Sequence, residues 1–116
     1  MRPPNILWIM ADELRPSALG CYGESWASVW TPNIDRIAAE GVMFGHNFCN
    51  SPACVPSRIS MLTGAAPERT GIYSNEGAWT SFPVPVRLKT FPEHFAANGF
   101  AVASVGKSHH SQAYTP

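Results

Sequence analysis

The sequence combines side-chain types that can bind and attack a tetrahedral oxyanion. They are two adjacent carboxylates, a cysteine, an arginine and a cluster of lysine and histidines: Asp12, Glu13, Cys54, Arg58, Lys107, His109 and His110. Hard divalent cations prefer carboxylate oxygens, and cationic side chains offset the charge of an anion. Together these groups predict transfer of a sulfuryl or phosphoryl group.

The spacing of the basic residues supports this chemistry. Cys54 lies just before a predicted helix, whose N-terminus attracts anions through its N–H groups and its dipole. Arg58 follows one helical turn later, where its guanidinium can bond two oxygens of the anion. Lys107 would add a point charge and His109 a proton or hydrogen bond, whereas His110 is expected to be a bystander.

Strands are expected to carry several of these groups at their carboxyl ends. Continuous apolar runs predict buried strands at 5–10, 42–48 and 100–105. The acidic pair follows the first run, and the lysine and histidines follow the last. Ligands of open α/β sheets bind beyond the carboxyl ends of strands, so both positions are candidate sites.

Two helices are expected in the middle of the chain. Thr31 can cap a first helix over 32–40, and Gly41 can end it. Its apolar residues Ile34, Ile37 and Ala38 fall on one face, at helical spacing. A second helix is expected to begin at Pro56 and to close at Gly64.

A third helix and a long loop complete the predicted elements. Thr90 and Glu93 form a capping-box pattern for a helix that ends at 98–99. A loop rich in Gly, Pro and Trp is expected at 65–87, and loops of this length are usually functional or belong to a larger context. The order strand, helix, strand, helix, helix, strand favours an α/β sandwich with a mostly parallel sheet.

Composition and charge exclude several classes of protein. The chain has 116 residues, of which 45% are apolar, so it can fold. Eight basic and eight acidic residues give a net charge of zero, which predicts neither a nucleic-acid partner nor an acidic membrane surface. No apolar run reaches the roughly 20 residues of a membrane span. The short apolar run near the N-terminus is a poor secretory signal, so we expect a cytoplasmic protein.

Charged residues make up only 14% of the chain, against about 25% in typical soluble domains. This deficit indicates that a larger parent protein or a partner covers part of the surface. A second copy of the chain, bound by self-association, is one such partner. Cys21, Cys49 and Cys54 are odd in number and irregularly spaced, so they predict no disulfide framework. His46, Cys49 and Cys54 are of types that bind zinc, but they offer three candidates at irregular spacing.

The motifs, in their order along the chain, resemble the sulfatase family of the alkaline-phosphatase-like superfamily. The resemblance rests on PNILWIMADE at 4–13, LGCYG at 19–23 with TPNIDRIA at 31–38, NSPACVPSRISMLTG at 50–64, and VGKSH at 105–109. It implies the α/β alkaline-phosphatase-like sandwich, with residues 1–116 as the N-terminal portion of a sulfatase catalytic domain. The C-terminal part of that domain is absent from these residues.

The resemblance implies a nucleophile made from Cys54. A formylglycine-generating enzyme would oxidise Cys54 to formylglycine, with Pro56 and Arg58 as its recognition residues. One hydroxyl of the hydrated aldehyde would attack the sulfur of a small-molecule sulfate ester, and the alcohol would leave. The second hydroxyl would then help to expel the bound sulfate and restore the aldehyde. Arg58 would hold the hydrated aldehyde and the metal-side charge, and Lys107 and His109 would bind the sulfate oxygens and the hydrated aldehyde.

A divalent metal is also implied by the resemblance. Asp12, Glu13 and the modified Cys54 would hold it, with Ca²⁺ expected and Mn²⁺ or Mg²⁺ as alternatives. Glu13 stands where many sulfatases have a second aspartate, Ala65 where an arginine is common, and Ser108 where a tryptophan is usual. The family's remaining metal ligands, an Asp with Asn or His, are not among the 116 residues.

Two alternatives to a sulfatase remain at this point. A phosphonate or phosphate ester hydrolase of the same superfamily would share these motifs. An inactive truncated fragment would also account for the missing ligands, and the isolated 116-residue chain is expected to be inactive.

Overall fold

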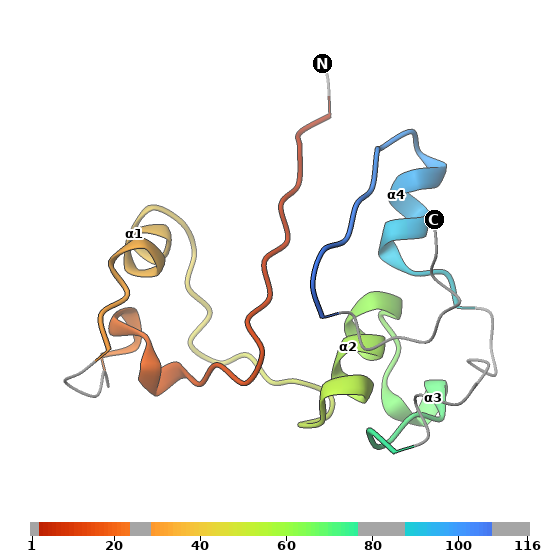
Figure 1. Cartoon of the computed structure of the whole chain (residues 1–116), viewed down its shortest axis with the longest axis horizontal. Helices are drawn as coiled ribbons and strands as arrows, with labels where there is room; N and C mark the ends of the chain where they lie inside the picture. The colour runs from red at the N-terminus through yellow and green to blue at the C-terminus, as the bar shows by residue number, and fades with distance from the viewer. Residues whose placement is uncertain (1–2, 24–28, 77–87, 108–116) are drawn as a thin grey trace. The chain divides into compact units, whose positions relative to one another are not determined.

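A computed structural model describes residues 3–23, 29–76 and 88–107 (Figure 1). The chain divides into two compact units, Met1–Asn47 and Phe48–Pro116. The expectation that 1–116 forms one incomplete catalytic domain stays a prediction.

The described residues of the first unit form two short 3-10 helices and one α-helix. They are η1 (Pro16–Ala18), η2 (Gly20–Tyr22) and α1 (Pro32–Glu40), and the last confirms the helix predicted over 32–40. Proline is the first helical residue of α1 and Gly41 follows its end. The predicted cap is wrong in one respect, because the Thr31 side chain makes no capping hydrogen bond to the helix backbone.

Thr31 instead joins the start of α1 to η2 through Asp35. The Thr31 hydroxyl donates to Asp35 Oδ1 at 3.1 Å and accepts the N–H of Gly20 at 3.0 Å. The same Asp35 oxygen accepts the N–H of Cys21 at 2.8 Å. These bonds connect the 19–23 and 31–38 motifs, so both motifs have a structural role in this unit.

Three α-helices form in the described part of the second unit, α2 (Cys54–Thr63), α3 (Pro67–Thr70) and α4 (Phe91–Ala97). Figure 1 shows α2 beside α3 and α4, and α2 contacts both. The buried apolar side chains Val55, Ile59 and Ala65 lie along and just after α2. The core of this unit therefore forms around α2.

The predicted boundaries of these helices are correct in part. The capping box of α4 is confirmed, since the Thr90 N–H donates to Glu93 Oε2 at 2.7 Å and the Glu93 N–H donates to Thr90 Oγ1 at 3.5 Å. Gly64 ends α2 in the left-handed conformation, as expected. The helix α3 falls where a loop was predicted, because Pro67 at its first position pre-forms the turn. Residues 77–87 of that predicted loop lie outside the described residues.

The three predicted strands are not confirmed, because the described residues contain no strand. Apolar side chains of these runs are exposed, namely Ile6, Leu7, Trp8, Ile9, Met10, Val42, Met43, Phe44, Phe48, Val102 and Val105. A strand forms only with a partner that pairs its backbone groups, and a two-sided apolar strand also needs covering layers. The mostly parallel sheet of the expected α/β sandwich therefore stays a prediction.

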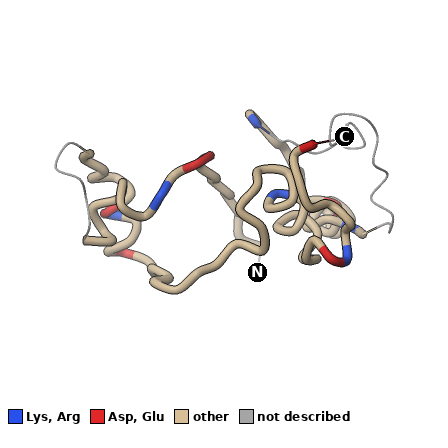
Figure 2. The backbone as a smooth tube through the Cα atoms, turned by 90° about the horizontal axis from the view of Figure 1, so that it is seen from below, with Lys and Arg blue, Asp and Glu red and all other residues tan. Residues whose placement is uncertain are grey.

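Charged residues of both signs occur in each unit. Figure 2 shows them scattered along the described backbone between long uncharged stretches. Local electrostatics therefore depend on individual side chains and not on one large charged surface. Within the described ranges, no helix is long and apolar enough to cross a membrane.

The close approach of Asp35 to Gly20 allows a steric test of packing in the first unit. A Cβ atom at Gly20 would lie 2.6 Å from Oδ2 of Asp35, whose carboxylate is held by two hydrogen bonds. Gly20→Ala should therefore lower the free energy of unfolding by about 1–3 kcal/mol. Urea unfolding, followed by circular dichroism, measures this change.

Gly45→Ala is the matched control, because a Cβ atom at Gly45 would have nothing within 4 Å. This variant should stay within about 0.5 kcal/mol of the unsubstituted protein. Equal unfolding midpoints for the two variants would contradict the packing of η2 on Asp35.

Candidate functional site

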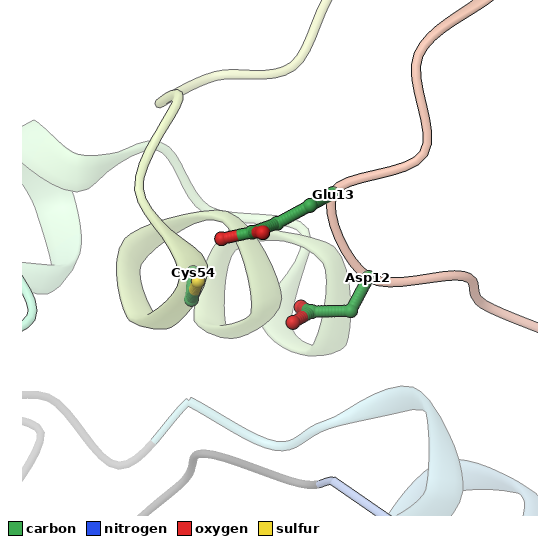
Figure 3. A group of neighbouring side chains, drawn as sticks. All are labelled: Asp12, Glu13 and Cys54. Atoms are coloured by element: carbon green, nitrogen blue, oxygen red, sulfur yellow. The ribbon is translucent and has the colours of Figure 1, made fainter. Parts of the chain in front are cut away.

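Cys54 is the first residue of α2 (Figure 3). The sequence placed it just before the helix, so the predicted start at Pro56 is wrong by two residues. The preceding Ala53 is extended, and Pro56 occupies the third helical position. Proline is tolerated there because the first-turn N–H groups have no partner within the helix. The half-buried, free thiol of Cys54 thus lies at the positive end of the helix dipole.

The N-terminus of α2 is held by a residue that sequence reasoning missed. The Val55 N–H donates to Oδ1 of Asn75 at 2.9 Å, across 20 residues of chain. Asn75 lies after α3, within the segment predicted as loop. Asparagine is a good capping residue, but a cap supplied from outside the helix has no sequence spacing that would reveal it.

Lys107 lies beside Cys54, as the predicted chemistry requires. Its Nζ is 4.0 Å from Cys54 Sγ, although 53 residues separate them in the chain. Lys107 directly follows the apolar run at 100–105 and Gly106. A cation at this distance can compensate negative charge that develops on the side chain at position 54.

Arg58 is buried on the second turn of α2, with 7% of its surface exposed. Its Nη1 donates to the backbone carbonyl oxygen of Lys107, across 49 residues. Sequence reasoning predicted that Arg58 binds the anion, and this bond adds a second role. One guanidinium N–H holds the backbone that carries Lys107, so Arg58 links α2 to the cation beside Cys54.

Asp12 and Glu13 belong to the first unit and follow its first apolar run. Both residues are exposed, and Figure 3 draws their carboxylates on consecutive backbone positions. Glu13 has a φ of 57°, a left-handed conformation that is uncommon for residues other than glycine and that clusters at functional sites. Adjacent, exposed carboxylates fit the oxygen donors that a hard divalent cation prefers. Their sharing of one metal with Cys54 stays a prediction.

The structure describes only some of the other positions that the sequence singled out. Ser108, His109 and His110 lie outside the described residues, so the role of His109 stays a prediction. Ala65, which stands where the family often has arginine, is 3% exposed and holds a small buried side chain.

The zinc alternative gains no support from the second unit. Cys49 and Cys54 are free thiols, and within the described part of this unit no cluster of three ligand residues forms around them. The thiol of Cys49 is exposed and that of Cys54 is half-buried. His46 belongs to the first unit and is exposed.

Comparisons with known proteins agree with the motifs. The family model described as Sulfatase matches residues 4–114. The chain is 42% identical over 106 residues to iduronate 2-sulfatase of Mus musculus, covering 91% of the chain and 18% of that protein. It is also 42% identical over 118 residues to N-acetylgalactosamine-6-sulfatase of Sus scrofa, covering 93% of the chain and 22% of that protein.

Arylsulfatase A of Homo sapiens is 40% identical over 114 residues, which cover 93% of the chain and 21% of that protein. The chain therefore spans about a fifth of the length of the curated relatives it matches. No solved structure matches the chain significantly.

The hydrogen bond of the buried Arg58 side chain predicts that substitution of this residue destabilises the second unit. Arg58→Lys keeps the charge but replaces the planar guanidinium, so the bond to the Lys107 carbonyl should be lost. We expect a loss of about 1–3 kcal/mol in the free energy of unfolding, because the buried side chain at position 58 would lose its bond to the Lys107 carbonyl. Arg69→Lys is the control, since Arg69 is exposed in the same unit. Identical urea midpoints for both variants would refute the structural role of Arg58.

Proposed function

Because the chain belongs to the sulfatase family, we propose that it forms the N-terminal part of a sulfatase catalytic domain. The domain would hydrolyse small-molecule sulfate esters, with formylglycine made from Cys54 as its nucleophile. The observation that carries the proposal is the position of Cys54, at the N-terminus of α2 with the Lys107 ammonium 4.0 Å from its sulfur.

The described residues of the second unit suit an attack on an anionic ester. The α2 N-terminus and Lys107 place positive charge around position 54, where a sulfate group would approach. Arg58 holds the backbone of Lys107, which keeps the base of that side chain near the reacting position. Preorganised charge of this kind stabilises the transition state more than solvent does.

Two groups that the chain does not itself encode would complete the chemistry. Hydrated formylglycine supplies a hydroxyl nucleophile at position 54 and a second hydroxyl for release of the sulfate. A divalent cation, proposed to be Ca²⁺, supplies Lewis acidity, with Mn²⁺ or Mg²⁺ as alternatives. Asp12 and Glu13 would hold that cation through carboxylate oxygens, and His109 would bind the sulfate with Lys107.

The names of the relatives support sulfate esters as the proposed substrate class. Iduronate 2-sulfatase, N-acetylgalactosamine-6-sulfatase and arylsulfatase A are all named for the removal of sulfate. Their names favour sulfate esters over the phosphonate and phosphate esters that the motifs alone leave open.

The proposal includes a formylglycine-generating enzyme as a partner, and burial constrains when it acts. Its recognition residues, Pro56 and Arg58, are both buried in α2. An enzyme that reads these side chains needs them exposed. Modification of Cys54 would therefore precede the folding of α2.

The test is turnover of an aryl sulfate with Ca²⁺ by the catalytic domain, produced in cells that contain the generating enzyme. Cys54→Ala should lower kcat/KM by more than about a hundredfold, because it removes the nucleophile. Cys49→Ala, which removes another free thiol of the same unit, should leave kcat/KM within about twofold.

Equal rates for Cys54→Ala and the unsubstituted enzyme would refute the proposed nucleophile. Addition of the generating enzyme to protein that has already folded with a Cys54 thiol should not produce activity. The 116-residue chain alone should show no turnover, since its acidic pair supplies only part of a metal shell.

A further inference from the structure

We propose that Asn75 is a positioning residue for Cys54, which it holds by capping the first turn of α2 from outside the helix. The proposal deepens the proposed function and rests on it, because it concerns the geometry of the same nucleophile. It starts from the hydrogen bond between the Val55 N–H and Asn75 Oδ1, at 2.9 Å.

The first turn of α2 needs an external cap because its own residues cannot provide one. The N-cap residue is Ala53, which has no polar side chain and makes no capping bond. Pro56 has no N–H, so the orphan donors of the first turn include those of Cys54 and Val55. Val55 is 3% exposed, which limits the access of water to its N–H. Asn75 therefore satisfies a donor that would be costly to leave unpaired.

The bond acts on Cys54 through the geometry of the peptide unit. The Val55 N–H lies in the same rigid plane as the carbonyl group and Cα of Cys54. A hydrogen bond to that N–H therefore restricts rotation of the plane, and with it the ψ angle of Cys54. The direction of the Cα–Cβ bond, which carries the reactive atom at position 54, follows from this restriction.

Asn75 and Lys107 thus act on position 54 from different parts of the unit. Asn75 fixes the backbone just after Cys54, whereas Nζ of Lys107 lies 4.0 Å from Sγ of Cys54. A nucleophile held by its backbone on one side and faced by a cation on the other is preorganised for attack. Misplacement of such a group costs rate more than it costs substrate binding.

The bond can be tested in protein whose Cys54 remains a thiol, without reliance on turnover. Asn75→Ala should accelerate hydrogen exchange of the Val55 amide by about three- to thirtyfold, because this N–H loses its acceptor. Alkylation of Cys54 by iodoacetamide should accelerate by a similar factor of about three to thirty, because fraying of the first turn exposes the half-buried thiol to the reagent. Asn75→Asp keeps an acceptor oxygen of the same reach, so it should keep Val55 exchange within about twofold. Unchanged Val55 exchange in Asn75→Ala would overturn the proposal, whatever the activity of the protein.

Asn98→Ala is the matched control, because Asn98 Nδ2 donates to the His94 carbonyl at the end of α4. This variant also loses an asparagine bond at a helix end of the same unit, so any change it shares with Asn75→Ala reflects general loosening. It should leave Val55 exchange and Cys54 alkylation within about twofold of the unsubstituted protein.

Turnover by the formylglycine form separates this proposal from the function on which it rests. Asn75→Ala should lower kcat about tenfold with KM changed less than about threefold, because the bond affects attack and not binding. Normal kcat in Asn75→Ala, with an active parent enzyme, would overturn the positioning role alone. A parent enzyme without Cys54-dependent turnover would instead refute the proposed function, and Val55 exchange together with Cys54 alkylation would then decide whether Asn75 positions Cys54.

Discussion

The first two turns of α2 connect every described part of the candidate site in the second unit. Cys54 begins the helix, Val55 is tied to Asn75, and Arg58 is tied to the backbone of Lys107. The three helical residues lie within one and a half turns, so their partners meet around one helix end. Burial of Val55 and Arg58 makes both ties costly to break. The position of the nucleophile and of the cation beside it therefore depends on the same short stretch of helix.

A different interaction explains why two motifs without predicted catalytic residues accompany the site. Asp35 accepts hydrogen bonds from Cys21 and Thr31, and its carboxylate leaves no space for a side chain at position 20. The 19–23 and 31–38 motifs therefore belong together for reasons of packing. The residues shared with sulfatases therefore fall into two groups. One group organises the first unit, and the other is predicted to take part in the chemistry.

Local patterns predicted the parts of the fold that depend on local physics. The capping box of Thr90 and Glu93 and the glycine that ends α2 were predicted, because each involves residues within one turn. The start of α2 was misplaced because proline is tolerated throughout the first turn, and Pro56 alone cannot tell its position in that turn. The bonds of Asn75 to Val55 and of Arg58 to Lys107 span 20 and 49 residues, and no local spacing predicts them. Strands depend on partners even more strongly, so the apolar runs alone could not establish a sheet.

If Cys54 is the precursor of the nucleophile, the mass of the peptide that contains it will show the conversion. The protein would be purified from cells with an active formylglycine-generating enzyme and digested, and the Cys54 peptide would be measured by mass spectrometry. Most of this peptide should carry an aldehyde in place of the thiol, while the peptides of Cys21 and Cys49 stay unmodified. A Cys54 peptide that remains entirely a thiol would contradict this role of Cys54.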